Sequence, residues 1–84
     1  MQFTLNEINT TIISLTNDDV KFIAPKNLSI NSVTIYDNLG RKIINLKGSE
    51  QTETYHLNTL SQSVYLAEIE LSNKQKIIKK FIKN

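Results

Sequence analysis

The chain of 84 residues contains no cysteine and no tryptophan, and it has only one proline and two glycines. Without cysteine, neither a disulfide framework nor a thiolate metal site can form. The scarcity of glycine and proline, together with abundant isoleucine and threonine, favours β-strands over disorder. A domain of this size must therefore obtain its stability from the packing of a small core.

Long hydrophobic runs are also missing. No apolar segment approaches the ~20 residues that a membrane-spanning helix requires. The first residues lack the basic start and the apolar centre of a secretory signal peptide. Taken alone, these absences predict a cytoplasmic protein, but that prediction lapses if the chain is the end of a longer protein.

Charge is nearly balanced overall and unevenly distributed. The formal net charge of +2 is too small to indicate nucleic-acid binding. Residues 74–84 contain five lysines and no acid, whereas acids outnumber bases in the rest of the chain. The basic character is therefore local to the C-terminal segment.

The strongest local signal is a β-hairpin around residues 37–40. A turn begins at Asp37 and ends at Gly40. The runs rich in β-branched residues on its two sides predict strands over residues 30–36 and 41–46. The carboxylate of Asp37 can accept a bond from the backbone N–H two residues on. Gly40 can take the positive φ that a type I turn followed by a bulge requires.

Alternation of apolar and polar residues predicts further strands over residues 3–8, 10–15, 20–24, 52–57, 64–71 and 75–83. The last of these segments fits a helix as well as a strand. The turn before it and its β-branched residues favour a strand. We expect a single all-β domain over residues 1–84, an immunoglobulin-like antiparallel β-sandwich of about seven strands. Its expected core includes Val33, Ile35, Tyr65, Ala67, Ile69 and Leu71.

No pattern for enzyme chemistry is present. His56 is the single histidine, in a strand position that points outward, so a metal site or catalytic triad would need distant carboxylates. Asp18 and Asp19 lack the spacing of a calcium loop and suit a solvated turn. Glu68 and Glu70 fall on the solvent face of a strand. The sequence predicts no enzyme activity, no catalytic residue, no metal site and no cofactor.

The lysine-rich segment allows two interpretations. Its charge suits nucleic acid, anionic lipid headgroups or an acidic protein groove, although nucleic acid is disfavoured because only Phe81 offers a base-stacking ring among the lysines. Alternatively, the lysines only protect a terminal edge strand from pairing with other chains.

Three blocks of sequence, in order, resemble the motifs of the C-terminal sorting domains (type A) of the bacterial type IX secretion system. The first is Val33-Thr34-Ile35-Tyr36-Asp37, followed after two residues by Gly40-Arg41-Lys42-Ile43. The second is Tyr55-His56-Leu57-Asn58-Thr59-Leu60-Ser61-Gln62-Ser63-Val64-Tyr65-Leu66-Ala67-Glu68-Ile69, which resembles the family's leucine, two small polar residues and glycine before valine-tyrosine-leucine. The third is Lys79-Lys80-Phe81-Ile82-Lys83-Asn84. The blocks lie within about two-thirds of the chain. Ser63 stands where the family usually has glycine, and the family's proline motif near the domain start is absent. The N-terminal third is therefore assigned by strand count alone.

The resemblance implies a secretion signal that directs an attached passenger protein across the outer membrane. Such a domain is non-catalytic and is itself removed by a sortase. It would be the excised end of a larger exported protein, found in the periplasm in transit and then at the cell surface or in the medium. The implied partners are the outer-membrane secretion machinery, the sortase and the passenger domain upstream, with no nucleic acid and no span of its own across the membrane.

The resemblance also assigns roles to residues. Recognition by the secretion machinery is expected at Lys79, Lys80, Phe81, Ile82 and Lys83. In this expectation Phe81 and Ile82 anchor the last strand, and the lysines form a charged surface. Structural roles are expected for the motif residues Tyr36, Asp37, Gly40, Leu60 and Tyr65.

A different class of protein also fits the predicted fold. A structural or carbohydrate-associated β-sandwich module of a cell-surface adhesin would need exposed aromatic side chains for sugar stacking. The aromatic residues here are few, and most alternate inward.

Overall fold

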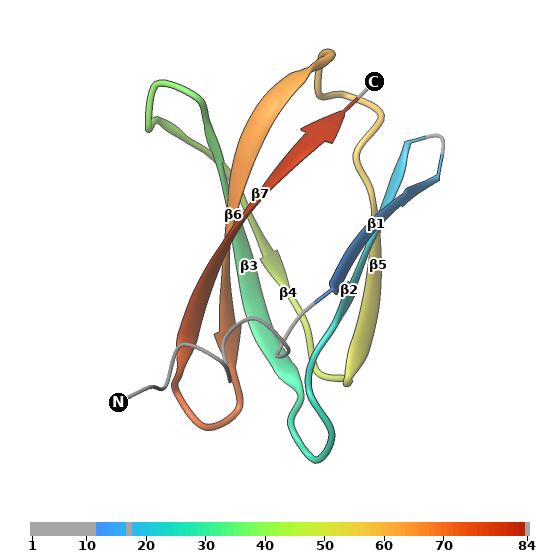
Figure 1. Cartoon of the computed structure of the whole chain (residues 1–84), viewed down its shortest axis with the longest axis vertical. Coiled ribbons are helices and arrows are strands. Elements are labelled where there is room, and N and C mark those ends of the chain that lie inside the picture. The colour runs from blue at the N-terminus through green and yellow to red at the C-terminus, as the bar shows by residue number, and fades with distance from the viewer. Residues whose placement is uncertain (1–11, 17, 84) are drawn as a thin grey trace.

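The computed structural model describes residues 12–16 and 18–83. Within these residues the chain is all-β, with two antiparallel sheets and no helix, an arrangement compatible with a β-sandwich (Figure 1). The three-stranded sheet has the order β1-β2-β5, formed by Ile12–Thr16, Asp19–Ile23 and Thr52–His56. The four-stranded sheet has the order β4-β3-β6-β7, formed by Lys42–Lys47, Ile30–Asp37, Ser63–Leu71 and Lys76–Lys83.

The predicted strands correspond to these elements with small shifts at their ends. The segment over residues 75–83 is a strand, so the strand interpretation was right and the helical one was wrong. The strand expected over residues 3–8 lies outside the described residues.

The core lies between the sheets and follows the alternation of the strands. Every second residue of β6 is buried, because successive side chains of a strand point to opposite faces. The burial predicted from the sequence is confirmed for Val33, Ile35, Tyr65, Ala67, Ile69 and Leu71. The three-stranded sheet contributes Val20 and Phe22, both fully buried. Burying a side chain of this kind contributes about 1.5–3 kcal/mol to the free energy of unfolding, so the core between the sheets is a main source of the stability of the domain.

The β3–β4 turn has the geometry that its sequence predicts. The backbone N–H of Gly40 donates to the carbonyl of Asp37 at 3.0 Å, and Gly40 has φ of +85°. Oδ1 of Asp37 accepts the backbone N–H groups of Leu39 and Arg41, both at 2.9 Å. Ile35 faces Ile44 while Tyr36 faces Lys42, so the fourth strand carries one extra residue next to the turn. The turn and the bulge together set the register of the sheet.

Replacing Gly40 with valine is expected to destabilise the domain by at least about 1 kcal/mol, because a β-branched residue is strained at positive φ. No heavy atom lies within 4 Å of the position that a Cβ would occupy, so the strain comes from the backbone and not from a clash. Gly40→Asn is the matched control, since asparagine tolerates this conformation better. Urea midpoints measure the difference, and an unchanged midpoint for the valine variant would contradict the turn geometry.

Candidate functional site

Each of the three motif blocks contributes to the four-stranded sheet. The first block forms the β3–β4 hairpin, the second runs from the end of β5 in the other sheet into β6, and residues 79–83 of the third form the end of β7. In this sheet β3 pairs with β6 and β6 pairs with β7, so segments that are far apart in the sequence lie side by side. The candidate site is therefore this sheet, with β7 as its lysine-rich edge strand.

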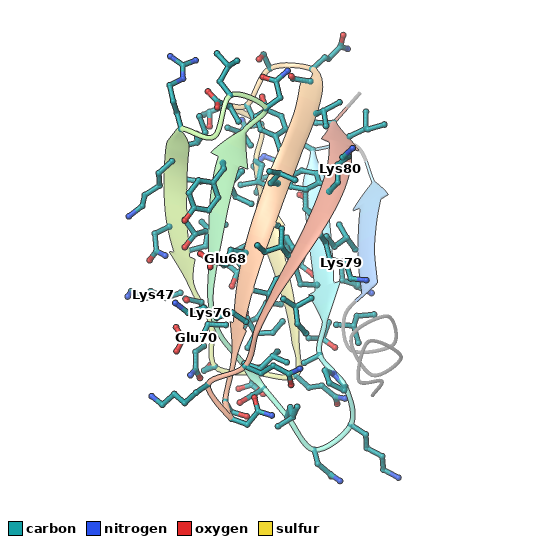
Figure 2. The ribbon with its side chains drawn as sticks, turned by 60° about the vertical axis from the view of Figure 1, so that its left-hand side comes forward. Lys47, Glu68, Glu70, Lys76, Lys79 and Lys80 are labelled. Carbon is teal, nitrogen blue, oxygen red and sulfur yellow. The ribbon has the colours of Figure 1, made fainter. Side chains whose placement is uncertain are left out.

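Strand alternation divides the side chains of β7 between two faces. Ile77, Lys79, Phe81 and Lys83 point toward the other sheet, and all except the half-buried Lys79 are buried. Lys76, Ile78, Lys80 and Ile82 point outward and are exposed. In Figure 2, Lys76 and the opposite residue Glu70 lie toward one end of the sheet, and Lys80 lies toward the other end of β7. The five expected recognition residues therefore do not form a single surface.

Lys83 has a structural environment that the sequence did not indicate. Its side chain is only 6% exposed, and its Nζ donates to Oδ1 of Asp18 at 2.9 Å. Asp18 lies immediately before β2, so this ion pair links the last strand of one sheet to the other sheet. The expectation that Lys83 contributes to an exposed charged surface is wrong, because its position on β7 turns it inward.

Phe81 and Ile82 also have different environments. Phe81 is buried, and its ring stacks on Tyr65 with centroids 5.7 Å apart. It anchors β7, as expected. Ile82 is 54% exposed, so the expectation that it anchors the strand is wrong. Adjacent residues of a strand face opposite ways, and only one of this pair can enter the core.

The second block shapes the loop that leads into β6. Oη of Tyr65 donates to the backbone carbonyl of Ser61 at 2.7 Å, and Leu60 packs against the core. Ser63 begins β6 and is not among the described residues with positive φ, which apart from glycine are Asn27 and Lys74. Serine is therefore compatible with this position, where type IX sorting domains usually have glycine.

Tyr36 links the hairpin to the neighbouring strand β6, and Asp37 stabilises the turn of the hairpin. Oη of Tyr36 donates to Oε1 of Glu68 on the neighbouring strand at 3.1 Å, and this hydrogen bond, together with burial and the charge of Glu68, raises the pKa of Tyr36. The pKa of Asp37 lies below its usual value, chiefly because its carboxylate accepts the backbone N–H of Arg41. Nε of Arg41 adds an ion pair at 2.7 Å.

Acid is expected to weaken the hairpin through Asp37. Because folding lowers the pKa of this carboxyl from 3.8, its contribution to stability is present above the unfolded value and is lost as the pH falls through the folded value. In Asp37→Asn the side chain can still accept backbone N–H groups but does not titrate, so the loss of stability below about pH 4 should be smaller than in the parent. Urea midpoints measured between about pH 5 and about pH 2 test this expectation, and parallel curves for the two proteins would contradict it.

A further ionisable pair lies in the three-stranded sheet. Nδ1 of the exposed His56 lies 2.7 Å from Oδ1 of Asp19 on the adjacent strand, a pair that no local sequence pattern predicts. Within the described residues no group of three or more histidine, aspartate or glutamate side chains could hold a metal ion. The same residues contain no helix long and apolar enough to cross a membrane.

These features define an all-β domain with two facing sheets and a basic edge strand. Comparison with known families identifies a match over residues 2–83, and the chain belongs to the family described as "Domain of unknown function (DUF8694)". No curated protein matches the chain.

Proposed function

We propose that this domain is a C-terminal sorting domain that directs an attached passenger protein across the bacterial outer membrane through the type IX secretion system. One observation carries the proposal: the three blocks that resemble sorting-domain motifs all contribute strands to one sheet, β3 and β4 from the first, β6 from the second and β7 from the third. Their motif residues also have specific structural roles. Asp37 and Gly40 make the turn, and Tyr65 holds the loop before β6 and packs against Phe81.

We further infer that the domain is an immunoglobulin-like sandwich of seven strands. The sheet orders β1-β2-β5 and β4-β3-β6-β7 support this inference, because hairpins that alternate between two sheets are typical of that class. The Tyr65 hydrogen bond supports it as well. A tyrosine near the start of the sixth strand that bonds to a backbone carbonyl a few residues upstream corresponds to the tyrosine corner of such domains.

In this proposal the domain catalyses nothing and is the substrate of the secretion machinery. The passenger precedes it in the polypeptide, crosses the inner membrane separately, and reaches the cell surface or the medium after a sortase removes the domain. Of the expected recognition residues, Lys80 and Ile82 are exposed to a partner, while Phe81 and Lys83 support the fold.

An export assay tests the proposal. A reporter protein with an inner-membrane export signal is fused to residues 1–84 and produced in a host with type IX machinery. We expect the fusion at the surface or in the medium, and the same reporter without the domain in the periplasm. A folded fusion that stays in the periplasm of several such hosts would refute the proposal.

The aromatic residues in the described part of the chain, which excludes Phe3, have environments that do not favour the alternative of a carbohydrate-associated module. Phe22, Tyr65 and Phe81 are buried, and Tyr36 is half-buried. The ring of Tyr55 packs edge-on against Phe22 at 5.8 Å, and its hydroxyl donates to the carbonyl of Lys47. Burial raises the pKa of Tyr55 to about 12. These rings are engaged within the domain, and sugar stacking needs exposed ones.

A further inference from the structure

The outward side of β7 is an unusual surface for so small a domain. It consists of Lys76, Ile78, Lys80 and Ile82, which we call the β7 outer surface. Ile78 is 65% exposed and Ile82 is 54% exposed. Ile78 and Ile82 lie on one face of one strand, so covering both with one partner would be favourable.

The neighbouring strand extends this surface unevenly. Ile82 lies opposite Val64, and Lys80 lies opposite Leu66, two apolar residues of β6 that are half-buried. At the other end, Ile78 lies opposite Glu68 and Lys76 opposite Glu70. The apolar surface therefore continues onto β6 near Ile82. The two acids of β6, Glu68 and Glu70, lie beside the first half of β7.

The lysines of the β7 outer surface are available for a partner. Within the described residues, the ion pairs involve Arg41, His56 and Lys83, and neither Lys76 nor Lys80 takes part in one. Two cations interleaved with two exposed isoleucines match an extended segment in which every second residue faces β7, and in which these facing residues are in turn acidic and apolar.

We propose that the β7 outer surface is the docking site for an acidic, partly apolar segment of a protein of the secretion machinery, an inference that rests on the proposed sorting function. A segment lying along β7 contacts the lysines and isoleucines and leaves the acids of β6 outside the interface.

Other occupants fit the surface less well. A flat anionic membrane laid on this face would also meet the carboxylates of Glu68 and Glu70, which point to the same side of the sheet. A second copy of the chain stacked β7 against β7 would bring the lysines of both copies together. Charge complementarity therefore favours an acidic protein segment.

The export assay with paired variants tests this inference. Lys76→Gln/Lys80→Gln removes the outward charges, and Ile78→Thr/Ile82→Thr removes the apolar groups while keeping β-branched side chains. Each double variant is expected to reduce the exported fraction about tenfold or more. Lys79→Gln, on the inward side of the same strand, is the matched control and should be exported like the parent domain.

The outcomes separate the two proposals. If the parent fusion is not exported, the sorting function is refuted and this inference falls with it. If the parent is exported and both double variants are folded and exported equally well, the sorting function stands and the docking surface is refuted. Thermal unfolding of each purified variant establishes that it is folded.

Two further measurements address the alternative occupants. The 84-residue protein is mixed with vesicles of phosphatidylcholine and phosphatidylglycerol, and its sedimentation with them is measured. We expect it to remain in solution. Binding that disappears in Lys76→Gln/Lys80→Gln would instead identify a membrane surface as the occupant. A dimer in analytical ultracentrifugation that disappears in Ile78→Thr/Ile82→Thr would identify a second copy, and either result would overturn the protein-segment proposal.

Discussion

Phe81→Ala is expected to destabilise the domain by about 3–4 kcal/mol, the usual cost of deleting a large buried aromatic side chain. Phe81 is 5% exposed and stacks on Tyr65, so its removal leaves a cavity at the contact between β6 and β7. The adjacent Ile82 provides a matched control. Because Ile82 is 54% exposed, Ile82→Ala should change stability by less than about 1 kcal/mol.

Urea unfolding of the two variants and the parent measures the contrast. The two residues are neighbours in sequence and both are large and apolar, so only the direction of each side chain separates them. Equal losses of stability in the two variants would mean that the alternation of β7 is not as described. The contrast also guides export experiments, because a Phe81 variant tests folding and an Ile82 variant tests the surface.

Asp18→Ala is expected to destabilise the domain by about 2 kcal/mol, because it leaves the ammonium group of Lys83 without its partner. Lys83 is 6% exposed at its side chain, and Asp18 is 45% exposed. Water can reach the pair from the Asp18 side, so the expected loss lies below that of a fully buried pair.

A second substitution distinguishes the charge effect from a general packing defect. Lys83→Met keeps most of the aliphatic volume and removes the charge. In the Lys83→Met background, Asp18→Ala should cost less than about 0.5 kcal/mol. Urea midpoints of the four proteins give the coupling energy, and a coupling near zero would contradict the role assigned to this ion pair.

Local chemistry explains why some features could be predicted from the sequence. The β3–β4 turn depends on residues that are close in sequence, since the Asp37 carboxylate bonds to Leu39 and Arg41 and the positive φ falls on Gly40. The core face of β6 was predicted because its alternation is regular along the strand.

Features that depend on distant contacts could not be predicted in this way. Asp18 and Lys83 meet although they are far apart in the sequence, and an inward-facing lysine runs against the usual preference of this residue for solvent. His56 meets Asp19 only because β5 pairs with β2. Gly48 is a further case, because a Cβ there would lie 2.7 Å from the carbonyl oxygen of Ile30, a close approach that no local pattern indicates.

The division of the lysine-rich segment illustrates the same limit. A count of charges treats Lys79, Lys80 and Lys83 as equivalent. In the strand their environments differ, because Lys79 is half-buried, Lys80 is exposed and Lys83 is buried. Changing all three together would therefore alter the fold and the surface at once. Variants of Lys76 and Lys80 address the surface alone.

The most direct test of the sorting function uses two host strains that differ only in whether the outer-membrane translocon of the type IX system is functional. The reporter fused to residues 1–84 is produced in both strains, and its amounts in the periplasm, at the surface and in the medium are measured. The sorting function predicts export in the strain with the translocon and retention in the periplasm of the other. Equal distribution of the fusion in the two strains would contradict it.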